Sequence, residues 1–119
     1  MKGNVLLVED IYINQIVVES FLVESGFRVT IVKDGEEAIE SLAAETPDII
    51  ILDLMMPIMD GFSLLAKLKG HADYPILVVS ARSDFESIEK AIFLGAADYL
   101  IKPFNSKDLI NKVERLCYK

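Results

Sequence analysis

Five short aliphatic runs alternate along the chain with longer segments in which apolar residues recur at helical spacing. The runs cover residues 4–8, 28–32, 48–52, 74–79 and 98–101. Runs of this length without an obvious polar face are typical of strands buried on both faces of a parallel sheet. The alternation therefore predicts a doubly wound α/β fold of five β–α units, (βα)5, with right-handed crossovers and helices on both faces.

Polar residues and glycines predict where the helices begin and end. The candidate N-terminal caps are Asp34 with Glu37, Asp60, Ser83 with Glu86, and Asn105 with Asp108. Gly26, Gly70 and Gly95 predict helix ends. The chain has no longer repeat and no Pro/Gly/Ser-rich linker, so we expect one domain over residues 1–119, with no room for an output domain.

The third run ends in a carboxylate, because Ile49 to Leu52 lead directly into Asp53. Burying an ionised carboxylate without a partner is costly, so this position demands an explanation. In open parallel sheets, ligands bind at the carboxyl ends of the strands, where the strand order reverses. Asp53 is therefore a candidate functional residue.

Three other strand ends carry polar residues. Glu9 and Asp10 follow the first run, Ser80 follows the fourth and Lys102 follows the fifth. In the flavodoxin-like strand order 2-1-3-4-5, the first and third strands are neighbours, so Glu9, Asp10 and Asp53 should meet. Each residue alone is better explained as a cap, a turn residue or a solvated lysine, but their combination favours a site.

The predicted acid cluster requires a cation. Two carboxylates ~4 Å apart repel by about 4 kcal/mol at an effective dielectric constant near 20, and Lys102 offsets only one charge. Oxygen ligands without His or Cys suit a hard ion, here Mg²⁺ rather than Ca²⁺. A metal beside Asp53, with a lysine and a hydroxyl nearby, is a combination of groups that suits phosphoryl transfer to that carboxylate.

Composition and charge limit the other classes of function. The 119 residues are 52% hydrophobic, which indicates a real core, and the formal net charge of −7 disfavours nucleic acid as a partner. The single cysteine, Cys117, forms no internal disulfide, and we expect it to pack or to lie exposed at the end of the last helix rather than to be redox-active. The N-terminal apolar run is too short for a signal peptide or a membrane span, so we expect a soluble, cytoplasmic chain with no membrane contact.

The sequence resembles the receiver domain of two-component response regulators through "VLLVED", "DIIILDLMMPIMDG", "PILVVSAR" and "GAADYLIKPF". The resemblance implies that Asp53 accepts a phosphoryl group from a phosphohistidine on a histidine kinase or histidine phosphotransfer protein. It implies Mg²⁺ held by Asp10, Asp53 and the Met55 carbonyl, with Glu9 helping directly or through water. Such a domain assists its own phosphorylation and dephosphorylation but is not an enzyme.

The same resemblance implies how phosphorylation is read. Lys102 would pair with the phosphoryl oxygens and precede a cis peptide bond to Pro103, and Ser80 would hydrogen-bond one oxygen after transfer. Tyr99 matches an aromatic residue that changes rotamer, so we expect its ring to swing inward and alter the face of the fourth helix, fifth strand and fifth helix. Phe93 falls outside the main apolar stripe of its helix on that face.

Some positions depart from the family pattern. Glu9 stands where many receivers carry Asp, and Ile11 replaces a frequent Asn. Ala97 replaces a frequent Asp of receivers from DNA-binding regulators, which weakens the case for their charge-paired dimer. The N-terminal half looks like receivers of hybrid kinases and the C-terminal half like those of DNA-binding regulators.

The first helix has more apolar positions than one core-facing stripe can hold. One stripe is Val17, Val18, Phe21 and Leu22; the other is Ile13, Ile16 and Val23, with Ser20. The surplus stripe has two interpretations: contact with a further domain of a longer parent protein, or a docking face for a helical kinase or phosphotransfer partner.

Three other classes of protein share parts of this pattern. A haloacid-dehalogenase-like phosphatase carries its nucleophilic Asp on the first strand with a second Asp two residues later, where this chain has Met55. A flavin-binding module needs a phosphate loop after the first strand, and "EDIYIN" is acidic instead. The third alternative is a receiver-like interaction domain that is never phosphorylated, and the intact set of acids, hydroxyl and lysine argues against it. His71 is expected to be a solvated loop residue.

Overall fold

The computed structural model describes residues 2–56, 60–69 and 74–118. Five strands and five helices alternate along them. Their bounds are β1 Asn4–Val8, α1 Tyr12–Glu24, β2 Arg28–Val32, α2 Gly35–Ala44, β3 Ile49–Asp53, α3 Gly61–Leu68, β4 Ile76–Ser80, α4 Phe85–Phe93, β5 Asp98–Ile101 and α5 Ser106–Cys117.

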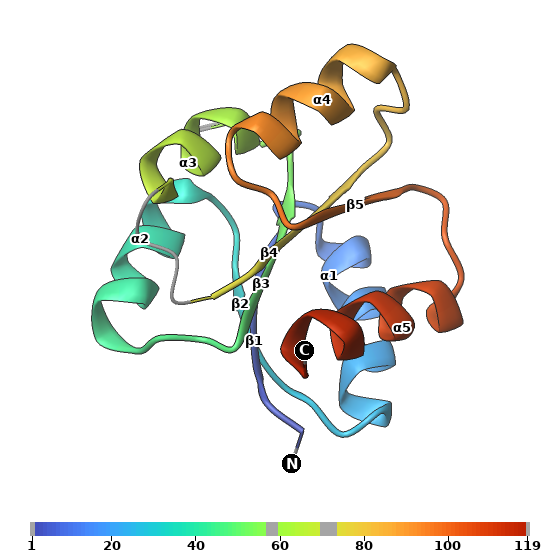
Figure 1. Ribbon diagram of the computed structural model, residues 1–119. Helices are drawn as coiled ribbons and strands as arrows, with labels where there is room; N and C mark the ends of the chain where they lie inside the picture. Colours follow the sequence, from blue (N-terminus) through green and yellow to red (C-terminus); the bar gives the residue numbers. More distant parts are fainter. Residues whose placement is uncertain (1, 57–59, 70–73, 119) are drawn as a thin grey trace.

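All pairs of neighbouring strands are parallel, in the order β2-β1-β3-β4-β5, which confirms the predicted doubly wound fold. Figure 1 shows α1 and α5 on one face of the sheet and α2, α3 and α4 on the other. In the centre, Val8 of β1 lies beside Leu52 of β3, so the two strands end at the same edge. The residues after Val8 and Leu52 are therefore brought together by the register.

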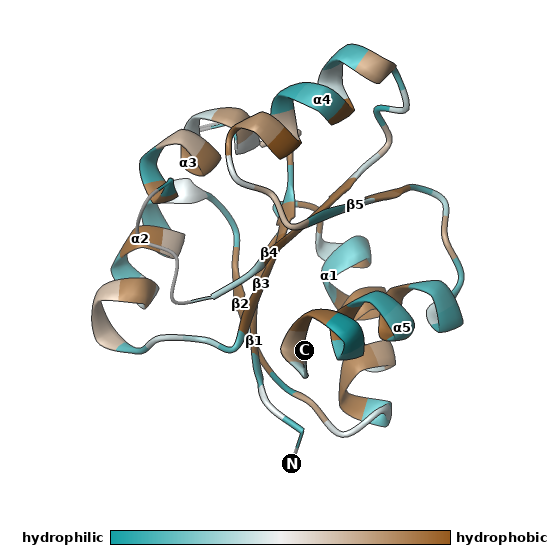
Figure 2. Ribbon diagram, in the orientation of Figure 1, coloured by the Kyte–Doolittle hydropathy of each residue, from teal (hydrophilic) through white to brown (hydrophobic). Residues whose placement is uncertain are grey.

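Side chains of the central strands alternate between two apolar layers, because successive residues of a strand point to opposite faces. Leu6 and Leu52 lie in the layer under α2, α3 and α4, whereas Leu7 and Ile51 lie in the layer under α1 and α5. All four are almost fully buried. In Figure 2 the strands are accordingly brown over most of their length.

Most predicted helix caps are confirmed. The side chains of Asp34, Asp60 and Asn105 accept hydrogen bonds from the amides of Glu37, Ser63 and Asp108. The prediction of Ser83 was wrong, because Asp84 occupies the extended cap position and its carboxylate accepts from the amide of Ser87 at 3.0 Å. The acid sits directly before the helix, where a side-chain oxygen reaches the first-turn amides.

Two predicted stops and the predicted cis peptide are also present. Gly26 and Gly95 follow α1 and α4 with φ of 98° and 114°, a region that glycine enters readily. The Lys102–Pro103 peptide is cis. Gly70 and His71 lie outside the described residues.

The two stripes of α1 are largely as predicted. Val18 and Leu22 are buried, while Ile13, Ile16 and Val23 are exposed. Val17 was assigned to the core stripe, which was wrong because it is 41% exposed. It lines a surface pocket of about 440 Å³ between α1 and the segments that follow β4 and β5. None of the helices in the described ranges is long and apolar enough to cross a membrane.

Candidate phosphoacceptor and metal site

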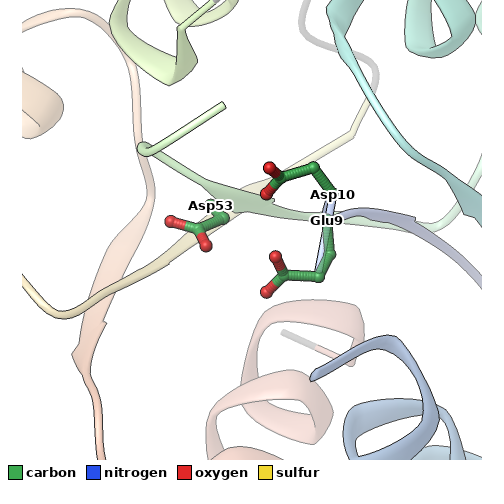
Figure 3. Close-up of side chains that lie close together, drawn as sticks. All are labelled: Glu9, Asp10 and Asp53. Carbon is green, nitrogen blue, oxygen red and sulfur yellow. The ribbon is translucent and has the colours of Figure 1, made fainter. Parts of the chain in front are cut away.

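Three carboxylates meet at the carboxyl edge of the central strands. Glu9 and Asp10 lie in the loop between β1 and α1, and Asp53 is the last residue of β3. One oxygen from each lies within 4.8 Å of the others. Figure 3 shows the three side chains around a common space. Glu9 and Asp53 are buried and Asp10 is half-buried, so the predicted cluster is present.

Lys102 joins the cluster from the segment after β5. Its Nζ donates to Glu9 Oε1 at 2.9 Å and to Asp53 Oδ2 at 3.0 Å. Burial alone would lower the pKa of Lys102, but the hydrogen bonds to Glu9 and Asp53 outweigh it and raise the pKa. Burial raises the pKa of Glu9, and the charge of Asp53 adds to this, while the bond from Lys102 partly offsets it. The ammonium group of Lys102 therefore forms ion pairs with two of the three acids.

Asp10 lacks the partner that a buried carboxylate requires. Among the residues that the structure describes, none forms a hydrogen bond with its buried Oδ1. Asp10 is also not a helix cap, because Ile11 is the N-cap residue of α1 and no described side chain caps that end. An unpaired buried anionic oxygen in an all-carboxylate cluster fits a hard divalent cation such as Mg²⁺.

The segment after β3 holds the carboxylate of Asp53 in place. The amide of Met55 donates to Asp53 Oδ1 at 3.0 Å, while the Met55 side chain is 56% exposed. The sequence reasoning missed Gly61, where a Cβ would lie 2.5 Å from the Cα of Leu54. Glycine therefore lets the start of α3 approach this segment, and its place directly after the cap Asp60 was the available signal.

Ser80 and Tyr99 meet at the backbone of Arg82. The Ser80 hydroxyl, fully buried at the end of β4, accepts from the Arg82 amide at 3.2 Å. The Tyr99 hydroxyl donates to the Arg82 carbonyl at 2.7 Å, and its residue is only 9% exposed. The expectation that the ring starts outside was wrong for this structure, because the Arg82 carbonyl offers its hydroxyl a partner on the inner side.

On the face of α4, β5 and α5, Phe93 lies outside the buried stripe of its helix, as predicted. Phe93 is 74% exposed, and Lys69 Nζ lies 4.6 Å from the centre of its ring. Asp98, next to Ala97, forms ion pairs within the chain to Lys112 at 2.8 Å and to Arg115. This acid is therefore already paired by residues of its own chain.

Comparison with known proteins agrees with the geometry. The family model described as "Response regulator receiver domain" matches residues 5–114. The chain is 37% identical over 108 residues to the "Probable transcriptional regulator ycf27" of Guillardia theta, covering 91% of this chain and 42% of that protein. It spans between about a quarter and about half of the length of the curated relatives it matches.

Two solved structures are similar over nearly their whole length. The receiver domain of the Francisella response regulator 1452 has a TM-score of 0.91 and 33% identity, covering 97% of this chain and 96% of that one. The receiver domain of the sensor histidine kinase PA1611 from Pseudomonas aeruginosa PAO1, solved with magnesium coordinated in its active-site cleft, has a TM-score of 0.90, 32% identity and 98% coverage of each chain. The sequence match, the strand order and the acidic cleft together show that the chain belongs to the response regulator receiver domain family.

Proposed function

We propose that this chain is a phosphoacceptor signalling domain in which Asp53 takes a phosphoryl group from a phosphohistidine. The donor would be a histidine kinase or a histidine phosphotransfer protein. The observation that carries the proposal is the setting of Asp53, a buried carboxylate bonded to Lys102 and grouped with Glu9 and Asp10. Ser80 lies one residue beyond Val79, the partner of Asp53 on the adjacent strand.

In the proposed reaction, an oxygen of Asp53 attacks phosphorus, and the P–N bond breaks with its electron pair returning to the imidazole. Asp10, Asp53 and the Met55 carbonyl would hold Mg²⁺, with Glu9 in contact directly or through water; the ion supplies charge neutralisation at the phosphoryl oxygens. Lys102 would pair with the same oxygens, which its hydrogen bond to Asp53 supports, and the hydrogen bond from the Met55 amide would orient the carboxylate. The domain assists this transfer but turns over no separate substrate.

Phosphorylation would be read through Ser80. Its hydroxyl would leave the Arg82 amide for a phosphoryl oxygen, and Arg82 is also bonded to Tyr99. We propose that this change alters the face of α4, β5 and α5. Transfer from an ATP-dependent kinase, together with a chain that has a single cysteine, supports a cytoplasmic location for the domain.

The test is incubation with acetyl phosphate and Mg²⁺, followed by measurement of the intact mass. The wild-type chain should gain the mass of one phosphoryl group, and Asp53→Asn should gain none. Asp60→Asn is the matched control, because Asp60 caps α3 at an exposed position and Asn caps about as well as Asp. This variant should be labelled like the wild type.

The intact mass also distinguishes a phosphoacceptor domain from a receiver-like interaction domain. A receiver-like interaction domain that is not regulated by phosphorylation would gain no phosphoryl group under any of these conditions. Stoichiometric labelling of Asp53→Asn at another residue would disprove the assignment of the acceptor.

A further inference from the structure

One side chain near the acid pair has no part in the proposed transfer. Gln15, in α1, donates from Nε2 to the backbone carbonyl of Glu9 at 2.6 Å. We infer that Gln15 is a positioning residue that holds the β1–α1 loop so that the Asp10 carboxylate faces Asp53, and thereby sets the affinity of the site for a divalent cation. The inference rests on the metal site of the proposed function but not on phosphorylation of Asp53.

Gln15 binds the loop on both sides of Asp10. Its side chain bonds the carbonyl of Glu9, and its own backbone amide donates to the carbonyl of Ile11 at 3.0 Å. The Glu9 amide is in turn bonded to the Val32 carbonyl of β2 at 3.0 Å. Asp10 therefore stands between two peptide groups that a single helical residue holds in place.

In this arrangement the Asp10 carboxylate does not cap the start of α1. An acid next to a helix start commonly turns its side chain toward the first-turn amides. Here Ile11 is the N-cap residue, and within the described ranges no side chain caps α1. Asp10 Oδ1 is instead buried without a hydrogen-bond partner among the described residues. One oxygen of Asp10 lies within 4.8 Å of oxygens of Glu9 and Asp53.

Holding like charges together needs such a restraint. Three carboxylate oxygens within 4.8 Å repel one another, and Lys102 contacts only Glu9 and Asp53. Without the Gln15 donor, the Glu9–Asp10 peptide gains freedom to rotate, and repulsion drives Asp10 away from Asp53. A cation would then have to reassemble its ligands on binding, which lowers affinity.

The test compares Gln15→Met with the wild type, because Met has a similar length and charge but cannot donate a hydrogen bond. The Kd for Mg²⁺, measured by calorimetry, should rise about tenfold, the lower end of the loss seen when groups that orient metal ligands are removed. The Mg²⁺ concentration that half-saturates acetyl phosphate labelling should rise equally. The rate at saturating Mg²⁺ should stay within about twofold, because the bonds of Asp53 to Lys102 and Met55 do not involve Gln15.

Ser20→Ala is the matched control. It also removes a side-chain bond to a backbone carbonyl on α1, from Ser20 Oγ to Val17 at 2.9 Å, but at an exposed position. Its affinity for Mg²⁺ should equal that of the wild type. Gln15 is the single glutamine of the chain, so ¹⁵N-glutamine labelling isolates its side-chain amide, whose NMR signals should shift as Mg²⁺ is added.

The outcomes are decisive in both directions. A Kd for Mg²⁺ within twofold of the wild type in Gln15→Met, or a lower saturated rate with unchanged Mg²⁺ dependence, overturns the inference. If Gln15→Met does not fold, Gln15→Glu is the second variant. Glu has the shape of Gln but, when ionised, cannot donate a hydrogen bond to the Glu9 carbonyl. Its negative charge alone would tighten the binding of Mg²⁺. Weaker binding in Gln15→Glu supports positioning, and equal or tighter binding refutes it. Calorimetry stays valid even if Asp53 takes no phosphoryl group, so the two proposals fail separately.

Discussion

At the scale of single residues, the three acids of the cluster have different surroundings. Both side-chain oxygens of Glu9 accept hydrogen bonds, from Ile11 and Lys102, and both oxygens of Asp53 do so from Met55 and Lys102. Asp10 alone has a buried oxygen without a partner among the described residues. The cost of keeping these charges together in the metal-free protein therefore falls mainly on Asp10.

Replacing Asp10 by Asn should stabilise the metal-free fold and weaken cation binding. Removing one of three mutually repelling charges should raise the free energy of unfolding by about 1 kcal/mol, or the melting temperature in EDTA by roughly 3–6 °C. The Kd for Mg²⁺ should rise at least about tenfold. Thermal melts with and without Mg²⁺ measure both effects, with Asp60→Asn as the control that changes neither.

A lower melting temperature together with unchanged Mg²⁺ affinity would contradict this prediction and make Asp10 a structural residue.

The sequence predicted that the acids converge, because strand ends in a parallel sheet share an edge. It did not predict the unpaired oxygen of Asp10 or the bond from Gln15. Both depend on side-chain rotamers in the β1–α1 loop and the first turn of α1, and no pattern of apolar residues constrains these rotamers.

Cys117 is a second residue whose surroundings give a measurable prediction. Burial raises the pKa of its thiol to about 11, and the charge of Asp48 adds to the shift. At pH 8 the thiolate fraction, and with it the rate of alkylation by iodoacetamide, should be about 100-fold lower in the folded than in the urea-unfolded chain. Mass spectrometry over time measures both rates.

The sign of the pH dependence follows from the raised pKa. The folded state holds the thiol proton more tightly, so the stability contribution is complete below the unfolded pKa and is lost as the pH rises toward about 11. Cys117→Ala should remove that loss. Equal alkylation rates in the folded and unfolded chains would show that folding does not shield the half-buried thiol.

At the scale of elements, the strands were easier to predict than the links between them. The buried runs of β1 and β3 appear directly as aliphatic letters, whereas the start of α4 was misplaced by one residue between Ser83 and Asp84. The link between Ser80 and Tyr99 was expected from family resemblance, but its route was not. Both side chains form hydrogen bonds with the backbone of Arg82, which has no sequence signal because every residue except proline supplies both groups.

Ser80→Ala should separate phosphorylation from its readout. The variant should still be labelled on Asp53, because the hydroxyl does not bond the carboxylate in this structure. In the wild type, beryllofluoride should shift the NMR signals of Tyr99 and of the Arg82 amide as Ser80 changes its partner. A charge-assisted hydrogen bond is worth about 1.5–3 kcal/mol, enough to bias a two-state element by one to two orders of magnitude. Ser80→Ala should lose most of the shift.

If Tyr99 responds equally strongly without the Ser80 hydroxyl, the coupling runs through Lys102 or the backbone instead. Because the ring of Tyr99 is already buried, the expected response is a change at its hydroxyl bond to Arg82 rather than a movement from the surface. Phe93 and Ile101 expose apolar surface on the face that this change would alter.

At the scale of the whole molecule, exposed apolar side chains gather on α1 and next to its start, as they do at protein interaction surfaces. The exposed side chains of this α1 surface are Ile11, Tyr12, Ile13, Ile16, Val17 and Val23. One of them, Val17, lines the pocket whose lining also includes Lys102 and Pro103, so a protein bound over that pocket would lie beside the acceptor site. A phosphodonor protein and a neighbouring domain of a longer protein are the two occupants to distinguish.

Ile16→Asp distinguishes the two occupants through the choice of phosphodonor. A charge in the centre of the α1 surface should slow transfer from a histidine kinase that phosphorylates the wild-type chain by about tenfold or more, since a desolvated charge in an interface costs at least 1–2 kcal/mol. Labelling by acetyl phosphate should be unchanged, because a small molecule needs no docking surface. Ile39→Asp on α2, across the sheet and similarly exposed, is the control and should accept the phosphoryl group normally from both donors.

Normal transfer to Ile16→Asp from the kinase would assign the α1 surface to a neighbouring domain, whereas an equal loss with both donors would indicate damage to the fold. Because Ile16 is 41% exposed, outside the two buried layers that hold the sheet, the kinase-specific loss is the expected result.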